Sequence, residues 1–218
     1  MYKNYIFDLY GTLVDIRTDE EKEELWVQMA GIYGQAGAVY MPDALQQAYL
    51  DECRRAEETM RREKGLEYPE IEIGQVFSEL FRRKGIQAER ETAEGLAYRF
   101  RKLSREYMRL YEGAERLLKR LKEDGKNVYL LSNAQRLFTV PEIEETGIGK
   151  YFDDIFISSD CGIKKPEKKY MEMLIEKHGL EKKECLMIGN EEESDIAVAD
   201  RCGVDSLLVK DGDYSAIL

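Results

Sequence analysis

Short apolar runs alternate with helical patterns through the second half of the chain, and this alternation constrains the fold more than any other feature. Amphipathic helical patterns separate strand-like runs at residues 127–131, 152–157, 185–188 and 204–209. Strands that alternate with helices at this spacing pair in parallel and are covered by helices on both faces. We therefore expect an α/β domain built on a parallel sheet.

A further strand pattern lies at residues 5–7 and ends on Asp8, and Gly11 and Thr12 follow as a turn. If this run belongs to the same sheet, Asp8 lies at the carboxyl edge of the strands, where open α/β folds bind ligands. Taken alone, Asp8 is explained equally well as a residue that ends a strand. The residues that follow the other strands therefore decide whether this edge is a site.

Residues 16–111 show a different pattern, in which helical stretches follow one another without a strand pattern. Thr18 and Glu21 have the spacing of a capping box at the start of the first helix. In the last helical stretch, apolar residues recur at the spacing of one helix face, at Leu96, Phe100, Leu103, Tyr107 and Leu110. We expect four helices that form a small inserted domain at residues 16–111, while residues 1–15 and 112–218 form the α/β core.

The charge balance restricts the partners of the chain. The 33 Lys and Arg residues oppose 44 Asp and Glu residues, which gives a net charge of −11 at pH 7. A surface with this excess of negative charge repels nucleic acid and acidic lipid, so we expect neither as a partner. No apolar run approaches the ~20 residues that span a bilayer, and the first residues carry no leader pattern. We expect a cytoplasmic monomer or homodimer.

The reactive side chains argue against several kinds of site. The only histidine is His178, and the cysteines are scattered at Cys53, Cys161, Cys185 and Cys202. A zinc site needs closely spaced thiolates or imidazoles, and a Ser-His-Asp site would need His178 as its base. His178 precedes Gly179 at a predicted helix end, which favours a contact with the helix terminus over catalysis. We expect free thiols and no zinc.

Polar side chains follow several of the predicted strands. Asp8 follows the first, Ser132 and Asn133 follow the strand at residues 127–131, and Asn190 lies beyond residues 185–188. Because the carboxyl ends of parallel strands lie at one edge of a sheet, we expect these side chains to meet there. Lys165 precedes a predicted helix and is able to reach the same edge. A carboxylate, a hydroxyl and a cation beside helix N-termini predict a site for a small anion.

Four sequence motifs resemble those of the haloacid dehalogenase-like (HAD) hydrolase superfamily. They follow the order of the family, at residues 8–13, 131–133, 158–166 and 187–196. Each motif alone is modest support, but four in this order and strand context are specific. The resemblance covers nearly the whole chain. It implies a Rossmann-like parallel sheet core with an inserted four-helix cap domain of the C1 type, which closes over the site and selects the substrate.

The resemblance also implies the roles of individual residues. Asp8 is the expected nucleophile, which forms a covalent aspartyl intermediate that water then hydrolyses. Thr12 and Ser132 are expected to hydrogen-bond the transferred group, and Lys165 to balance the charge of nucleophile and substrate. The residues expected to support these contacts are Gly11 and Asn133 for the substrate, and Asp195 for Lys165 or a metal-bound water.

Tyr10 departs from the pattern of the family's phosphatases, which carry a second Asp at this position as general acid and base. General acid catalysis typically contributes ~10²–10⁴-fold, and an alkoxide leaves poorly without a proton. A tyrosine hydroxyl, with an ordinary pKa near ~10, can donate a proton but is a poor base at neutral pH. Tyr10 stays among the candidate catalytic residues, and we expect weakened acid catalysis.

Asn190 is the second departure, because the family's phosphatases have a magnesium-binding Asp at this position. Mg²⁺ prefers hard oxygen ligands, and an amide carbonyl lacks the charge of a carboxylate. The expected magnesium ligands are Asp8, the backbone carbonyl of Tyr10 and Asn190, with Glu191 or Asp195 as a further carboxylate. The need for Mg²⁺ stays open at this stage.

Three functions follow from this pattern. The first is a phosphatase that acts on a small phosphorylated metabolite with weakened acid catalysis. The second is a hydrolase like the 2-haloacid dehalogenases, which have a tyrosine at the position of Tyr10 and work without metal. Residues 18–53, however, hold no arginine to receive halide, and residues 187–196 lack the Ser-Ser-Asn run of those enzymes. The third is a catalytically weak protein that binds a phosphorylated ligand or a partner protein.

Overall fold

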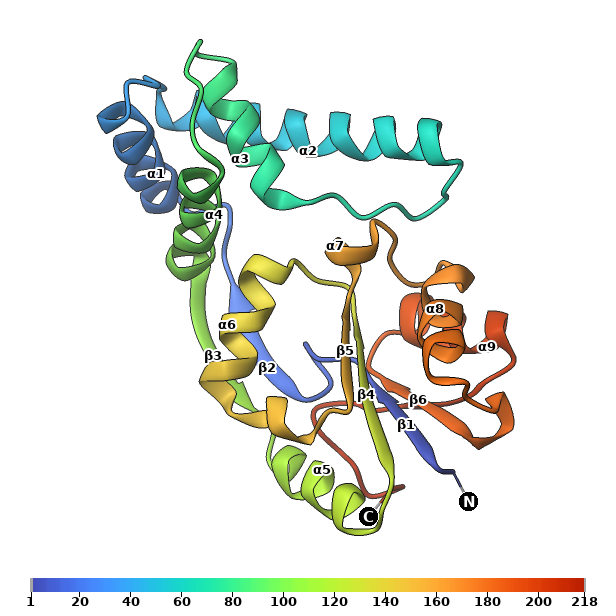
Figure 1. The fold of residues 1–218 in the computed structure, drawn as a ribbon. Helices are drawn as coiled ribbons and strands as arrows, with labels where there is room; N and C mark the ends of the chain where they lie inside the picture. Colours follow the sequence, from blue (N-terminus) through green and yellow to red (C-terminus); the bar gives the residue numbers. More distant parts are fainter. Residues whose placement is uncertain (1, 218) are drawn as a thin grey trace. The chain divides into compact units, whose positions relative to one another are not determined.

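The computed structural model describes residues 2–217, which divide into two compact units (Figure 1). The core unit contains the residues up to Ile16, the segment Leu66–Glu70 and the residues from Met108 onward. The helical unit contains Arg17–Gly65 and Ile71–Tyr107. From the sequence we expected residues 16–111 to form one inserted domain, so the grouping of Leu66–Glu70 with the core unit differs from that expectation.

The core unit is built on a parallel sheet. Each strand pairs in parallel with its neighbour, and β1 is the central strand. The chain fills one side of β1 and then returns to fill the other, so a topological switch point lies at the carboxyl end of β1. This arrangement confirms the predicted Rossmann-like α/β class. The strand order is β5 (Asp154–Ile157), β4 (Asn127–Ser132), β1 (Asn4–Phe7), β6 (Cys185–Gly189) and β7 (Asp205–Leu208).

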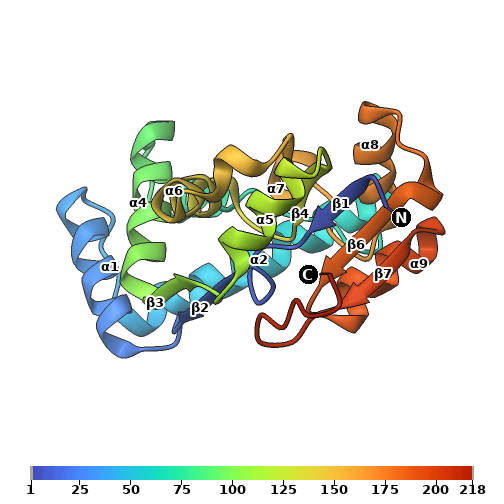
Figure 2. The same cartoon turned by 90° about the horizontal axis from the view of Figure 1, so that it is seen from below.

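Helices cover both faces of this sheet (Figure 2). On β1, Phe7 packs in a cluster with buried residues of α5 and α6, whereas Ile6 packs in a second cluster with α8 and α9. Successive side chains of a strand point to opposite faces, which explains the division. The longer helices of the core unit are α5 (Ala114–Glu123), α6 (Arg136–Thr146), α8 (Lys168–His178) and α9 (Ala197–Cys202). The short ones are η1 (Ile148–Tyr151), α7 (Ser158–Cys161), η2 (Lys182–Glu184) and the π-helix η3 (Glu192–Ile196).

The helical unit has an aromatic core of its own. Phe100 is fully buried, and its ring centroid lies 5.6 Å from Trp26, 5.2 Å from Tyr49 and 5.4 Å from Phe77. These rings come from different helices, so their packing joins the helices at one centre. The helices of this unit are α1 (Glu23–Gln35), α2 (Pro42–Lys64), α3 (Ile73–Arg82) and α4 (Arg90–Ser104).

Residues 105–110 form the strand β3 (Arg105–Leu110) and not the last turns of a helix, so the predicted end of the fourth helix is wrong. Helix α4 ends at Ser104, and β3 pairs with β2 (Val14–Thr18). Pairing with β2 satisfies backbone groups that a longer helix would have satisfied internally. Met108 and Leu110 are partly buried against the core cluster whereas Tyr107 and Arg109 are exposed, which also fits the period of two of a strand.

The predicted capping box at Thr18 is also wrong. Thr18 lies in β2, and helix α1 begins only at Glu23. The carboxylate of Asp19 instead accepts hydrogen bonds from the backbone N–H groups of Glu21 and Lys22, at 2.9 and 3.1 Å. The strand continues through Thr18, so the Asp19 side chain stabilises the turn before the helix.

Within residues 2–217, no helix has the length and apolar composition that a bilayer span requires. The cysteines are free thiols, as we expected, and burial raises the pKa of each. A raised pKa keeps a thiol in its less reactive, protonated form at neutral pH.

We expect Phe100→Ala to lower the free energy of unfolding by about 3–5 kcal/mol, because truncation of a buried aromatic ring leaves a cavity. Trp26 is the only tryptophan and packs against Phe100, so its fluorescence reports unfolding in urea. The control is Val39→Ala, at a residue that is 70% exposed, which should change this free energy by less than about 0.5 kcal/mol. Equal effects of the two changes would contradict the packing described above.

Candidate active site

Asp8 follows β1 directly and lies at the carboxyl edge of the sheet. Its backbone N–H donates to the carbonyl of Ile188 on β6, at 2.9 Å, and the residue is only 7% exposed. Because β1 lies between β4 and β6, the terminal residues of these strands, Ser132 and Gly189, flank Asp8. The sheet therefore brings together strand-end residues that are far apart in the sequence.

Lys165 joins two carboxylates at this edge. Its Nζ donates to Asp8 Oδ1 at 2.7 Å, to Asp195 Oδ1 at 2.6 Å and to the Leu131 carbonyl at 2.8 Å. These three acceptors match the three N–H groups of an ammonium ion. Lys165 is 2% exposed and Asp195 is 1% exposed, so protein atoms replace water around both. Two carboxylates and one ammonium give this triad a net charge of −1.

Burial raises the pKa of Asp8 to about 6, because desolvation disfavours its charged form. The positive charge of Lys165 opposes this increase, and the negative charge of Asp195 adds to it. Burial alone would lower the pKa of Lys165, but attraction to Asp8 and Asp195 outweighs burial and raises it. Lys165 is therefore an ammonium ion at neutral pH, and Asp8 becomes a carboxylate as the pH rises past about 6.

Asn133 holds the loop that carries Lys165. Its Nδ2 donates to the Lys165 carbonyl at 3.0 Å, and its Oδ1 accepts from the Lys165 backbone N–H at 2.7 Å. Both ends of the amide are therefore engaged with the lysine backbone. These hydrogen bonds position the Lys165 backbone, and the substrate contact that the resemblance implies for Asn133 stays a prediction.

The hydroxyl of Ser132 is fully buried and has no hydrogen-bond partner among residues 2–217. The backbone carbonyl of the same residue does have one, because it accepts from the Tyr170 hydroxyl at 3.0 Å. A buried polar group that lacks a partner costs about 1–3 kcal/mol. Since Ser132 ends the strand next to β1, a buried hydroxyl without a partner lies at the same edge of the sheet as Asp8.

The turn that follows Asp8 lies against Asn190. Thr12 Oγ1 donates to Asn190 Oδ1 at 3.1 Å. Gly11 has a φ of +79°, and a Cβ added there would lie 2.4 Å from Asn190 Nδ2. Glycine is therefore required at this position for its backbone conformation and for the close approach of Asn190.

Asp195 lies in the π-helix η3, and both of its carboxylate oxygens are engaged. Oδ1 accepts from Lys165, and Oδ2 accepts from the backbone N–H groups of Asn190 and Glu191, at 3.0 and 3.1 Å. A Cβ on Gly189 would lie 2.3 Å from the Asp195 side chain, so a glycine is needed there. Of the two expected roles, orientation of Lys165 matches these contacts.

Tyr10 directs its hydroxyl towards helix α6. The hydroxyl hydrogen-bonds with Glu142 Oε2 and with Thr139 Oγ1, the latter at 3.2 Å. Glu142 is 4% exposed and Thr139 is fully buried. No pattern in the sequence connects this helix with Tyr10, because residues three apart on a helix share a face whatever they contact.

The segment Leu66–Glu70, which we call the linker segment, binds the loop that precedes Lys165. The Glu70 backbone N–H donates to the Gly162 carbonyl at 3.2 Å, and the Lys164 N–H donates to the Tyr68 carbonyl at 3.0 Å. In the sequence this stretch is only a break between predicted helices, which Gly65 and Pro69 mark. The Glu70 carboxylate accepts from Ser158 Oγ at 2.7 Å and from Gln135 Nε2 at 3.0 Å.

The predicted magnesium ligands offer the oxygen donors that the ion prefers, but only one of them is a negatively charged carboxylate. Asp8, Asn190 and the carbonyl of Tyr10 offer hard oxygen donors, which Mg²⁺ prefers. Within residues 2–217, no group of three or more His, Cys, Asp or Glu side chains is placed to hold a metal ion. Glu191 is exposed and accepts from the Ser194 hydroxyl at 2.8 Å. The donors therefore fit Mg²⁺ with one carboxylate among them.

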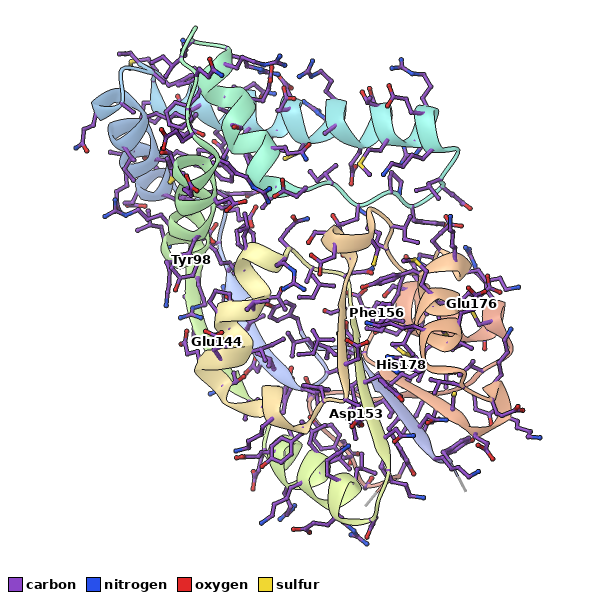
Figure 3. All side chains as sticks on the ribbon, viewed as in Figure 1. Tyr98, Glu144, Asp153, Phe156, Glu176 and His178 are labelled. Carbon is purple, nitrogen blue, oxygen red and sulfur yellow. The ribbon has the colours of Figure 1, made fainter. Side chains whose placement is uncertain are left out.

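His178 lies away from this edge, on helix α8 (Figure 3). A hydrogen bond of 2.7 Å joins its Nε2 to the carboxylate of Asp154, and its ring centroid lies 4.8 Å from that of Tyr129. Asp154 begins strand β5, so this contact lies at the amino end of the sheet, opposite to Asp8. Its position gives His178 no part in chemistry at Asp8.

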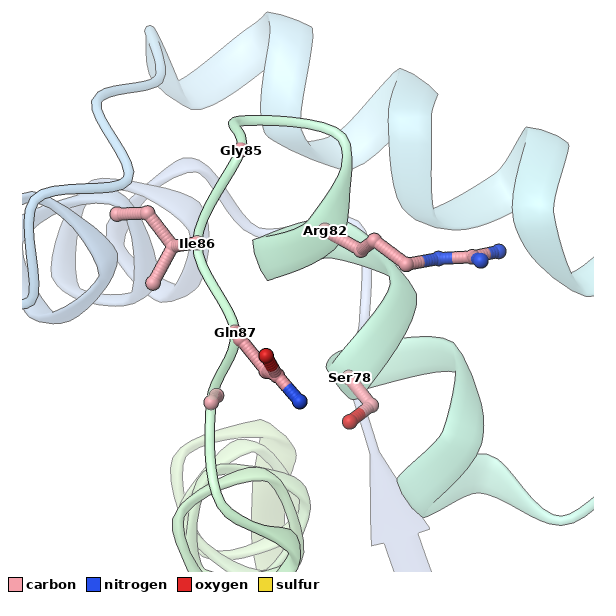
Figure 4. A pocket seen from close by; sticks show the side chains of 6 residues that line it. Ser78, Arg82, Gly85, Ile86 and Gln87 are labelled. Carbon is pink, nitrogen blue, oxygen red and sulfur yellow. The ribbon is translucent and has the colours of Figure 1, made fainter.

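A cavity of about 310 Å³ in the helical unit contains none of the predicted site residues (Figure 4). The side chains of Ser78 and Gln87 point toward each other, and Arg82 extends away and pairs with Glu79 at 2.5 Å. A single cation that is already paired does not make a catalytic constellation. The residues that line the cavity are Ser78, Arg82, Gly85, Ile86, Gln87 and Ala88.

Comparison with known proteins identifies the class of this site. A family model described as "haloacid dehalogenase-like hydrolase" matches residues 2–203. The chain belongs to the haloacid dehalogenase-like hydrolases, and it is an enzyme of that superfamily. This match confirms the resemblance that the four motifs carry.

Two curated relatives are named for hydrolysis of phosphorylated metabolites. The pyrimidine 5′-nucleotidase PynA of Streptococcus pneumoniae is 25% identical over 211 residues, which cover 94% of this chain and 83% of PynA. The glyceraldehyde 3-phosphate phosphatase of Pyrococcus furiosus is 26% identical over 111 residues, which cover 51% of this chain and 46% of that enzyme. The second match therefore spans about half of either protein.

Solved structures show the same fold. The HAD hydrolase YfnB of Bacillus subtilis, solved with magnesium bound, has a TM-score of 0.54 and 19% identity over 95% of this chain and 88% of YfnB. The L-2-haloacid dehalogenase of Xanthobacter autotrophicus has a TM-score of 0.55 and 18% identity over 96% of this chain and 78% of that enzyme. At these identities the likeness concerns the fold alone.

In metal-free protein, we expect the Asp8 carboxyl to titrate with a midpoint at about pH 6, measured by ¹³C NMR of the aspartate side chains. Lys165→Met should move this midpoint higher, because the positive charge of Lys165 stabilises the carboxylate form. Asp8→Asn should lack the signal, which identifies it. A midpoint near the ordinary value of ~4 in the unmodified protein would contradict the described burial of Asp8.

Proposed function

We propose that the protein is a phosphatase that hydrolyses a small phosphorylated metabolite through an aspartyl-phosphate intermediate at Asp8. The observation that carries this proposal is the buried, unpartnered hydroxyl of Ser132 at the sheet edge that presents Asp8. A phosphate oxygen is an acceptor that this hydroxyl would satisfy. The ammonium group of Lys165 lies at the same edge, and its positive charge would stabilise the negative charge of a bound anion.

The charge of the site supports a role for Mg²⁺. The triad of Asp8, Asp195 and Lys165 carries a net charge of −1, and a phosphate monoester brings about −1.5 to −2 more at neutral pH. Mg²⁺ held by Asp8, Asn190 and the Tyr10 carbonyl would supply positive charge to the phosphate oxygens. The magnesium-bound structure of YfnB, a protein of the same fold, is consistent with this role.

In the proposed reaction, each residue of the site has a separate role. A carboxylate oxygen of Asp8 attacks phosphorus, and the bond from phosphorus to the leaving oxygen breaks. Lys165 holds Asp8 Oδ1 and fixes the orientation of the carboxylate, and Ser132 donates to an oxygen of the transferred group. Water then attacks the phosphorus of the aspartyl phosphate, which releases phosphate and restores Asp8.

The substrate class rests on the named relatives. PynA and the P. furiosus enzyme are both named for hydrolysis of small phosphorylated metabolites. We assign the choice among such substrates to the helical unit, which is inserted between the nucleophile segment and the rest of the core. Tyr10 in place of the second Asp predicts slower reaction with alkyl esters than with esters of better leaving groups.

Hydrolysis of a 2-haloacid at Asp8 is the second candidate. Tyr10 favours it, because halide leaves without a proton, and the X. autotrophicus dehalogenase has the same fold. The absence of arginine from residues 18–53 argues against it. A protein that binds a phosphorylated ligand without turnover is the third candidate, which the intact triad around Asp8 disfavours.

One paired assay separates these candidates. We expect release of phosphate from 4-nitrophenyl phosphate, an increase in this rate with Mg²⁺, and no release of chloride from 2-chloropropionate. The aryl ester is chosen because its leaving group needs little help from an acid.

Asp8→Asn is the matched control, because it keeps the shape of the side chain and removes the nucleophile. This variant should lose turnover to the level of the uncatalysed reaction. Turnover that survives in Asp8→Asn would exclude the aspartyl intermediate. Chloride release without phosphate release would replace the first candidate by the second, and ligand binding without either would favour the third.

We expect Asn190→Asp to bind Mg²⁺ at least about tenfold more tightly, because it adds a carboxylate to a set that holds one. Isothermal titration calorimetry measures the affinity directly, and the Mg²⁺ concentration for half-maximal phosphate release should fall in parallel. Glu193→Asp, at an exposed residue of the π-helix η3 that follows Asn190, serves as the control. An unchanged affinity in Asn190→Asp would remove Asn190 from the ligands.

A further inference from the structure

Glu70 is a buried carboxylate in the linker segment, and the function proposed above gives it no role. It is 8% exposed, so its carboxylate needs hydrogen-bond donors from the protein. Ser158 Oγ donates to Oε2 at 2.7 Å, and Gln135 Nε2 donates to Oε1 at 3.0 Å. Ser158 follows β5 directly, and Gln135 lies shortly beyond the end of the neighbouring strand β4. Glu70 therefore joins the two loops that leave the sheet edge on the β4 side of Asp8.

The fully buried hydroxyl of Ser158 connects Glu70 with the backbone of Ala134. Its oxygen accepts from the Ala134 N–H at 2.8 Å and lies 3.1 Å from the Ala134 carbonyl oxygen. A hydroxyl has one proton, which either that carbonyl or Glu70 can accept. Glu70 is the closer acceptor, at 2.7 Å, so the proton points to Glu70 and the oxygen lone pairs stay available for the Ala134 N–H. The carboxylate thus determines the direction in which this hydroxyl points.

The same backbone stretch carries Ser132, whose hydroxyl donates to the transferred group in the proposed reaction. The Ser132 carbonyl accepts from the Tyr170 hydroxyl at 3.0 Å, and the Ala134 N–H donates to Ser158. The Ser132 hydroxyl therefore projects from a stretch that is held at two points. Such restraint matters for rate, because a misplacement of about 1 Å in a catalytic group can cost ~10²-fold.

We propose that Glu70 is a positioning residue for the phosphatase reaction. Through the Ser158 hydroxyl, it fixes the loop that presents Ser132 to the transferred phosphoryl group. This inference rests on the proposed function, because the position of Ser132 affects the rate only if its hydroxyl binds that group. Glu70 lies outside the four sequence motifs, so the linker segment adds a determinant of the site that the motifs do not contain. Glu70 contributes to the rate only while the Ser132 hydroxyl is present.

The test measures kcat/KM for 4-nitrophenyl phosphate with and without that hydroxyl. Ser132→Ala alone should lower kcat/KM about 10²-fold, as the loss of a donor to the reacting group typically does. Glu70→Ala should lower it about tenfold in otherwise unmodified protein, because the donor is then displaced. In the Ser132→Ala background, Glu70→Ala should cost less than about twofold, because the hydroxyl that Glu70 positions is already absent.

Three further variants separate the hydrogen bond from other effects of the change. Glu70→Gln keeps an oxygen that accepts from Ser158, so it should restore most of the activity that Glu70→Ala loses. Ser158→Ala removes the same connection without a change in the linker segment, and it should lower kcat/KM about tenfold as well. This smaller change tests the connection even if Glu70→Ala fails to fold. The control is Glu67→Ala, at an exposed residue of the linker segment, which should leave kcat/KM unchanged.

Binding of inorganic phosphate gives a readout that does not depend on turnover. Phosphate is the product, and the Ser132 hydroxyl would donate to it as it does to the transferred group. In the presence of Mg²⁺, Glu70→Ala and Ser158→Ala should each raise the Kd of phosphate about fivefold, the usual effect of one hydrogen bond. Isothermal titration calorimetry measures this Kd. An unchanged Kd in both variants would mean that the contact serves only the stability of the core unit.

Two kinetic results would also overturn the inference. If Glu70→Ala costs the same factor with and without the Ser132 hydroxyl, Glu70 does not act through Ser132. If Glu70→Gln is as slow as Glu70→Ala, the hydrogen bond from Ser158 is not what Glu70 supplies. A failure of the proposed function looks different, because unmodified protein would then release no phosphate, or Asp8→Asn would retain turnover.

Discussion

The site depends on the hydrogen bonds that the ammonium group of Lys165 donates to two carboxylates and a backbone carbonyl. A lysine that is 2% exposed is tolerable only because three acceptors, two of them carboxylates, receive its three N–H groups. Removal of Lys165 would leave two buried carboxylates without a positive partner, so the triad requires that loops from distant parts of the chain are held in register. Asn133 clamps the lysine backbone, and two backbone amides hold Asp195.

Backbone geometry sets how closely these groups approach. The strand order places Asp8, Ser132 and Gly189 at one edge of the sheet. Glycines at this edge then leave space for the polar side chains beside them. A Cβ on Gly11 would overlap Asn190, and a Cβ on Gly189 would overlap Asp195. The two glycines therefore serve packing between polar groups. The same edge remains electrically unbalanced, with more negative than positive charge, and this imbalance is what a bound cation would correct.

Much of the site could be predicted from the sequence, because strand ends in a parallel sheet must share an edge. That rule brings Asp8, Ser132 and Asn190 together without any knowledge of packing. It does not find Glu142, whose contact with Tyr10 depends on how α6 is rotated and on which of its faces turns inward. It also misses β3, since the apolar spacing at residues 96–110 fits a helix throughout, and only pairing with β2 decides otherwise.

The linker segment has a mechanical consequence. Because Leu66–Glu70 groups with the core, the chain passes between the units after Ile16, Gly65, Glu70 and Tyr107, and not at two points only. Hydrogen bonds from the middle of this segment to the core limit the backbone conformations that are open to it. The restraint is fastened to Gly162 and Lys164, directly before the lysine. A change in the backbone of the linker segment would therefore be transmitted to the loop that sets the position of Lys165.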